Sequence, residues 1–142
     1  MILVLIIIFV VLLDQVTKYL ARYHHFKKNT KKIKYISYLE NTGGATGVMD
    51  GQMWLFYIIT IIVFIVAVLA SKYIDFENNI IFSIGLGVAL GGTIGNFIDR
   101  VVNGAVIDFL EFKHKKGILV YNIADVAITV GFILIIIGLI RW

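Results

Sequence analysis

The sequence predicts a mainly α-helical membrane protein, in which four transmembrane helices are joined by a small β-rich segment and a hairpin-containing loop. Of its 142 residues, 60% are hydrophobic and 15% are charged, whereas a soluble domain carries about 25% charged residues. Four apolar segments approach the roughly 20 residues that a helix needs to cross a bilayer. We therefore expect a single integral membrane domain, with spans at about 1–21, 53–71, 80–98 and 122–140.

The four spans differ in their polar content. The first is interrupted by Asp14 and Lys18, the second and third carry no charge, and the fourth has Asp125 in its first turn. The third is rich in glycine over residues 85–92, and we expect these small residues to permit close helix packing. The basic run at 27–32 lies beside a span, so anionic lipid headgroups are its expected partners.

The two long connections contain β signals. Residues 33–39 are rich in β-branched and aromatic side chains with partial alternation, which predicts a strand within the β-rich connection at about 22–52. In the third connection, Asn103-Gly104 lies between apolar runs, the strongest short signal for a hairpin. A hairpin there would fold Asp108 back towards the end of the third helix.

Composition excludes several classes of site. With no cysteine, the chain has no disulfide and no thiol nucleophile. Its three histidines form no His-Glu-x-x-His pattern, so we expect neither a zinc site nor any other metal or cofactor. The net charge of +4 comes from clusters beside the apolar spans, which favours lipid headgroups over nucleic acid as the partner.

Four spans place the first and third connections on one side of the membrane, and polar residues of three helices converge there. Ionisable residues within spans are functional candidates by default, but each also has a structural interpretation. Asp14 and Lys18 have the i,i+4 spacing of an ion pair. Arg100 could neutralise Asp99, and Asn122 with Asp125 could cap the fourth helix.

Five short motifs, in order along nearly the whole chain, resemble those of the lipoprotein signal peptidases, also called signal peptidase II. One such motif would be weak evidence, but five in order are highly specific. They are Asp14-Gln15-Val16-Thr17-Lys18, Asn41-Thr42-Gly43, the segment from Gly91-Gly92-Thr93 to Asn96-Phe97-Ile98-Asp99-Arg100, Val106-Ile107-Asp108-Phe109, and Asn122-Ile123-Ala124-Asp125.

This resemblance implies an aspartic endopeptidase with four helices and an extracytoplasmic β-rich cradle. Its substrate would be a prolipoprotein, cut before a diacylglyceryl-modified cysteine, and the enzyme would be a monomer surrounded by lipid in the bacterial cytoplasmic membrane. The catalytic pair falls on Asp108 and Asp125. Substrate-binding or supporting positions fall on Asn41, Gly43, Asn96, Arg100, Asn122 and Ala124, and structural polar positions fall on Asp14, Lys18 and Asp99.

Three features depart from the family pattern. Asn41-Thr42-Gly43 is followed by Gly44-Ala45-Thr46, where the family has two alanines and an aromatic residue, and residues 116–121 lack the family's proline. Most of the 13 lysines and arginines lie on the first and third connections, which the positive-inside rule would place in the cytoplasm. We follow the family, because a folded cradle and a substrate site can require basic residues locally.

Other classes of function remain open at this point. A homologue that binds lipidated peptides without cutting them would share all five motifs. A small proton-conducting membrane protein would spread carboxylates through the bilayer, whereas the second to fourth spans have none in their inner halves. A presenilin-type protease would need a Gly-x-Gly-Asp motif, which is absent.

Overall fold

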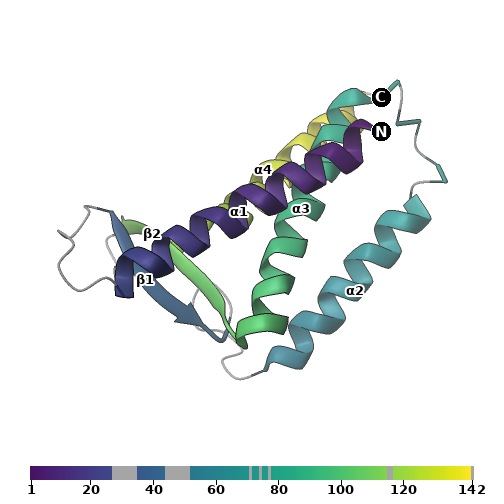
Figure 1. The fold of residues 1–142 in the computed structure, drawn as a ribbon. Helices are drawn as coiled ribbons and strands as arrows, with labels where there is room; N and C mark the ends of the chain where they lie inside the picture. The colour runs from purple at the N-terminus through teal and green to yellow at the C-terminus, as the bar shows by residue number, and fades with distance from the viewer. Residues whose placement is uncertain are drawn as a thin grey trace.

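A computed structural model describes residues 1–26, 35–43, 52–70, 72–73, 75–76, 78–114 and 117–141. The basic run at 27–32 and Gly44-Ala45-Thr46 lie outside these ranges. In chain order the elements are α1 (Ile2–Phe26), β1 (Ile36–Asn41), α2 (Met53–Ala70), α3 (Ile80–Asn103), β2 (Val106–His114), β3 (Gly117–Tyr121) and α4 (Ile123–Ile140). The four expected helices are therefore confirmed. Both chain ends lie at the end of the helices remote from the sheet (Figure 1).

The helices differ in how far they can reach across a bilayer. Among the described residues, α1, α3 and α4 are long and apolar enough to span a membrane, and α2 is a shorter apolar helix. The first and third extend further than expected from the sequence, to Phe26 and Asn103. The polar residues near these ends therefore lie on continuous helices.

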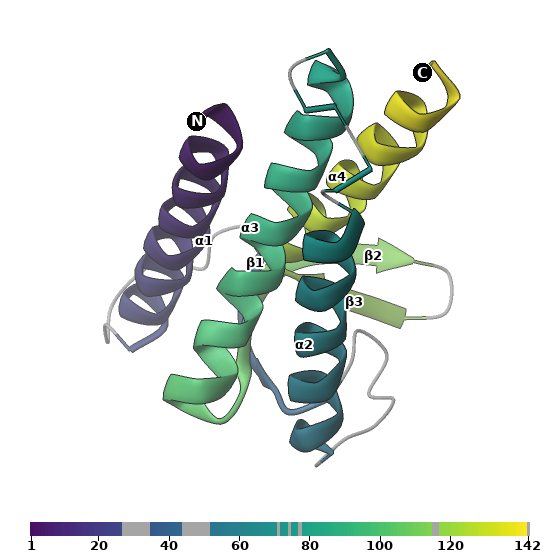
Figure 2. The ribbon, with the colours of Figure 1, turned by 90° about the vertical axis from the view of Figure 1, so that its right-hand side faces the viewer.

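Helix α3 lies between α1 and α4, and its glycines allow both neighbours to approach closely (Figure 2). Gly91 faces α1, where an added Cβ would lie 2.7 Å from Cβ of Val10. Gly92 faces α4, where a Cβ would lie 2.5 Å from the carbonyl oxygen of Ala124. Real Cβ atoms do not approach so closely, so the expectation that these glycines serve helix packing is confirmed.

Helix α2 stands apart from the other three and contacts α3 near the sheet (Figure 1). The Tyr57 hydroxyl donates a hydrogen bond to the carbonyl oxygen of Arg100 at 3.1 Å. The Tyr57 ring also meets Phe97 edge-on, with centroids 5.8 Å apart. These contacts attach the beginning of α2 to the last turns of α3.

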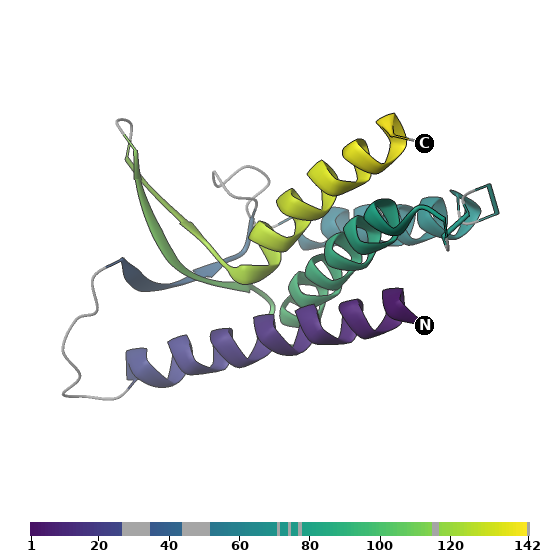
Figure 3. The same ribbon diagram turned by 90° about the horizontal axis from the view of Figure 1, so that it is seen from above.

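The three strands form one antiparallel sheet in the order β1-β2-β3. Leu39 pairs with Asp108 between β1 and β2, and β2 continues into β3 as a hairpin that projects away from the helices (Figure 3). The strand expected at 33–39 is confirmed where the structure describes it, since β1 begins at Ile36. The sheet places Asp108 beside the ends of α3 and α4.

The hairpin predicted at Asn103-Gly104 is wrong in its position. Helix α3 continues to Asn103, and Gly104 ends it in the left-handed conformation, with φ of 69° and its N–H donating to the carbonyl oxygen of Arg100. Positive φ suits Gly both in a tight hairpin turn and at a helix C-terminus. The same dipeptide therefore signals either structure, and the hairpin of the third connection is β2–β3.

We expect Gly131→Ala to destabilise the α3–α4 contact. A Cβ at Gly131 would lie 2.5 Å from the backbone nitrogen of Ala89, so the two helices must separate, at a cost of about 1–3 kcal/mol. Thermal unfolding in detergent should show a lower midpoint. Val130→Leu is the matched control, because that side chain is 43% exposed on the same helix. Equal midpoints for the two variants would contradict this account of the packing.

Candidate active site

Asp108 lies on β2, buried to 1% exposure, with a hydrogen-bond donor at each carboxylate oxygen. The amide of Asn122 donates to Oδ1 at 2.7 Å, and the amide of Asn41 donates to Oδ2 at 2.9 Å. The orientation of Asn41 is fixed in turn, because its own Oδ1 accepts the backbone N–H of Gly43 at 2.9 Å. The structure thus brings Asn41 and Gly43 to the candidate catalytic residue.

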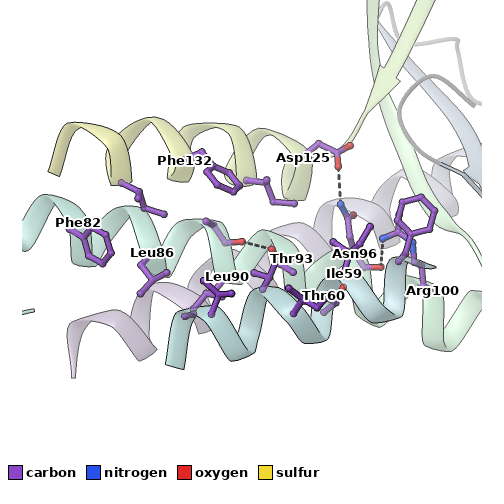
Figure 4. A pocket seen from close by; sticks show the side chains of 18 of the residues that line it. Ile59, Thr60, Phe82, Leu86, Leu90, Thr93, Asn96, Arg100, Asp125 and Phe132 are labelled. Carbon is purple, nitrogen blue, oxygen red and sulfur yellow. Dashed lines mark hydrogen bonds between the residues drawn. The ribbon is translucent and has the colours of Figure 1, made fainter. Parts of the chain in front are cut away.

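Asp125 is half-buried in the first turn of α4 and forms a capping box with Asn122. The Asp125 N–H donates to Oδ1 of Asn122 at 2.9 Å, and Oδ2 of Asp125 accepts the Asn122 N–H at 3.3 Å. Its other oxygen accepts the amide of Asn96 at 2.8 Å (Figure 4). The expectation that these residues cap the helix is correct, but capping uses only one oxygen of Asp125.

Two asparagines join the carboxylates of Asp108 and Asp125. The amide nitrogen of Asn122 reaches both Asp108 and, at 3.1 Å, Oδ1 of Asn96. Asn96 then donates to Asp125. A continuous chain of amides therefore connects two acidic groups from different elements.

The electrostatics show that the two acids interact. The pKa of Asp108 is raised from 3.8 to about 6, chiefly by burial and also by the negative charge of Asp125, although hydrogen bonds from the amides of Asn41 and Asn122 lower it. A carboxyl group that titrates near neutrality can donate or accept a proton under physiological conditions. Because the charge of Asp125 contributes to this shift, the protonation of Asp108 is coupled to its acidic neighbour.

The expected ion pair between Asp14 and Lys18 is confirmed, but it belongs to a larger cluster. The Lys18 ammonium lies 2.7 Å from Asp14 and 2.9 Å from Asp99, and all three side chains are at most 2% exposed. Asp99 is therefore neutralised by Lys18, and the expectation that Arg100 does so is wrong. The side chain of Asp99 turns towards α1, since helix–helix packing places the lysine there.

The carboxylates of the cluster also accept hydrogen bonds from backbone N–H groups of two other elements. Asp14 accepts the N–H of Ala124 at the start of α4 at 2.9 Å, and Asp99 accepts the N–H of Ile107 in β2 at 3.1 Å. Gln15, which sequence reasoning missed, donates to Asp99 at 3.1 Å and to the carbonyl oxygen of Gly95 at 3.2 Å. The sequence feature that could have identified Gln15 as part of this cluster is its position next to Asp14.

Arg100 faces the site from the last turns of α3. Its guanidinium lies 4.1 Å from the centroid of the Phe56 ring and donates weakly to the carbonyl oxygen of Asn96 at 3.3 Å. Its Nε is buried and has no hydrogen-bond partner among the described residues. Arg100 therefore retains a donor beside the two carboxylates.

An apolar cavity of about 800 Å³ leads to this site between α2, α3 and α4 (Figure 4). Its walls are almost entirely hydrocarbon, with Leu86 and Leu90 on α3 facing Phe132 on α4. Asn96, Arg100 and Asp125 form its polar end. The arrangement can hold a long apolar ligand with one end against Asp125, which the two asparagines connect to buried Asp108. Such a geometry suits acid–base chemistry at an amphiphilic substrate.

Comparison with known proteins agrees with the motifs and the fold. Residues 6–141 match the family described as Signal peptidase (SPase) II. The chain is 40% identical to a lipoprotein signal peptidase of Geobacillus kaustophilus, over 89% of this chain and 84% of that protein. It is 37% identical to one from Staphylococcus aureus, over 97% and 87%.

Solved structures agree as well. A bacterial membrane enzyme structure superposes with a TM-score of 0.80 at 38% identity, covering 98% of this chain and 87% of that one. A second gives a TM-score of 0.77, also at 38% identity, covering 96% and 91%. The chain is a multi-pass membrane protein that belongs to the signal peptidase II family of aspartic peptidases.

Proposed function

We propose that this protein removes signal peptides from prolipoproteins, cutting before a cysteine that carries a diacylglyceryl group. The observation that carries the proposal is that two asparagines join Asp108 to Asp125, which lies at the polar end of an apolar cavity. The lipoprotein signal peptidases to which the chain is similar support the substrate class. The apolar parts of the substrate would occupy the cavity.

In the proposed mechanism, Asp108 holds the shared proton and Asp125 acts as the base. Burial raises the pKa of Asp108, which favours its protonated form. Ionised Asp125 draws a proton from a water molecule, and the resulting hydroxide attacks the carbonyl carbon of the scissile bond. Asp108 donates a hydrogen bond to the developing oxyanion, and the leaving amine is then protonated by the dyad.

The neighbouring residues have supporting roles in this proposal. Asn41, with its backbone partner Gly43, and Asn122 hold the Asp108 carboxyl in place. Arg100, at the polar end of the cavity, donates to a carbonyl oxygen of the substrate. Ala124, through its N–H, ties the start of α4 to the buried ion cluster. The monomer contains all of these residues, so we propose that it is the active form.

Replacing either acid should slow cleavage strongly. We expect Asp108→Asn and Asp125→Asn each to lower kcat by about 10²–10⁴-fold, the contribution of a general acid or base. The assay incubates purified protein in detergent or lipid with a diacylated precursor and an unlipidated one. Asp75→Asn is the matched control, because Asp75 lies in the α2–α3 connection, away from the two acids, where it accepts a hydrogen bond from Asn78. Binding without cleavage by the wild-type protein would identify a non-cleaving homologue.

Removing the Asn41 amide should shift the pH dependence. This amide stabilises ionised Asp108, which lowers its pKa, so Asn41→Ala raises that pKa above about 6. If activity needs one proton on the pair, kcat/KM falls as the pH rises through this pKa, and the falling limb moves to higher pH in the variant. The distant Asn78→Ala should leave the limb in place. A limb that moves to lower pH would refute the assigned proton.

We propose that the active site lies at the extracytoplasmic face of the cytoplasmic membrane. The chain has no native cysteine, so Lys113→Cys on the hairpin and Tyr73→Cys in the α2–α3 connection each introduce one thiol. Both side chains are exposed. A membrane-impermeant maleimide should label Lys113→Cys in intact cells and Tyr73→Cys only after permeabilisation. The reverse pattern would place the site in the cytoplasm, as charge distribution alone suggests.

A further inference from the structure

Lys18 is a fully buried cation for which the proposed chemistry has no use. It is 1% exposed and is the largest of the fully buried side chains. Burying an ammonium group is costly unless charged and polar partners compensate for its lost hydration. The contacts of Lys18 therefore indicate what this charge does in the protein.

The ammonium group of Lys18 makes three short contacts, one for each N–H. Two go to the carboxylates of Asp14 and Asp99, at 2.7 Å and 2.9 Å. The third goes to the side-chain oxygen of Asn96 at 3.0 Å. Two contacts thus pair the ammonium with carboxylates of the cluster, while the third goes to Asn96, which donates to Asp125.

The third contact determines which way the Asn96 amide faces. An ammonium group can only donate hydrogen bonds, so it must face the amide oxygen and not the amide nitrogen. Asn122 donates to the same oxygen. If the amide were reversed, its NH₂ group would face two donors. Asn96 is therefore held with its nitrogen towards Asp125, at 2.8 Å.

The orientation of Asn122 has a separate origin. Its amide oxygen accepts the backbone N–H of Asp125 at 2.9 Å, inside the capping box of α4. The capping box therefore fixes Asn122, whereas Lys18 supplies the charged one of the two donors that fix Asn96. Among the charged groups around Asp125, Arg100 and Asp108 approach from α3 and β2, whereas Lys18 acts from α1 through Asn96.

We propose that Lys18 is a positioning residue of the peptidase, which fixes the Asn96 amide so that it donates a hydrogen bond to the Asp125 carboxylate. This inference rests on the proposed function. Without the ammonium, the Asn96 oxygen keeps only the neutral donor Asn122, so the amide is held less firmly in the orientation that donates to Asp125. The apolar walls of the cavity, which would hold most of the substrate, do not change with the Asn96 amide, so the loss falls mainly on kcat and little on KM.

The test compares Lys18→Met with a matched disruption of the same cluster. We expect Lys18→Met to lower kcat by about 10²-fold, as misplacement of a reacting group does, with KM changed by less than about threefold. Gln15→Met is the control, since Gln15 contacts Asp14 and Asp99 but not Asn96. It should lower the thermal midpoint and leave kcat within about twofold. An equal loss of kcat in both variants would make Lys18 merely structural.

A double-mutant cycle tests whether Lys18 acts through Asn96. In an Asn96→Ala background, Lys18→Met should cause no further loss of kcat, because residues acting in series are not additive. Losses that multiply would overturn the proposal. If Lys18→Met does not fold, Lys18→Met/Asp99→Asn replaces it, because that pair removes one positive and one negative charge and leaves the net charge of the cluster unchanged.

A second measurement does not depend on cleavage. The side-chain amide resonances of selectively ¹⁵N-labelled asparagine should shift at Asn96 in Lys18→Met, while those of Asn41 stay in place. An unchanged Asn96 resonance would refute the positioning role. If the wild-type protein cuts no precursor and Asn96 still shifts, the proposed function fails and the contact from Lys18 to Asn96 stands.

Discussion

One buried positive charge, the Lys18 ammonium, joins three helices and the sheet through polar contacts. The Lys18 ammonium pairs with Asp14 on its own helix and with Asp99 on α3. The same two carboxylates accept backbone N–H groups from Ala124 in α4 and Ile107 in β2. Lipid offers little driving force for helix association. A charge-assisted network therefore sets the register of three helices and the sheet at the depth where the two candidate catalytic acids meet.

Much of the fold follows from the sequence, because membrane helices obey strong one-dimensional rules. Apolar length predicts the four helices, and the i,i+4 spacing predicts the pair of Asp14 with Lys18. The partner of Asp99 was assigned wrongly, since local spacing favours Arg100 while only packing of α1 on α3 brings Lys18 within 2.9 Å. Asn103-Gly104 was misplaced for a related reason: a positive φ is needed both in a tight turn and at a helix end.

The sequence predicts which residues form the candidate site, but it does not predict the hydrogen bonds that join them. Alternation of the spans brings Asp125 and the end of α3 to one membrane side, and the family motifs indicate Asp108. Only the three-dimensional structure shows that Asn96 and Asn122 form a continuous chain of hydrogen bonds between these acids. Hydrogen-bond direction depends on angles and distances within about 3 Å, and residue spacing carries no such information.

The sparse attachment of α2 has a consequence for how molecules reach the site. Side chains that line the cavity are themselves largely exposed: Ile62 is 53% exposed, Val66 58% and Phe132 55%. In a bilayer these surfaces face acyl chains, so the cavity fills sideways from the lipid phase. The concentration that matters is then the two-dimensional one in the membrane. A ligand's partition coefficient, as much as its fit to the cavity, sets the occupancy.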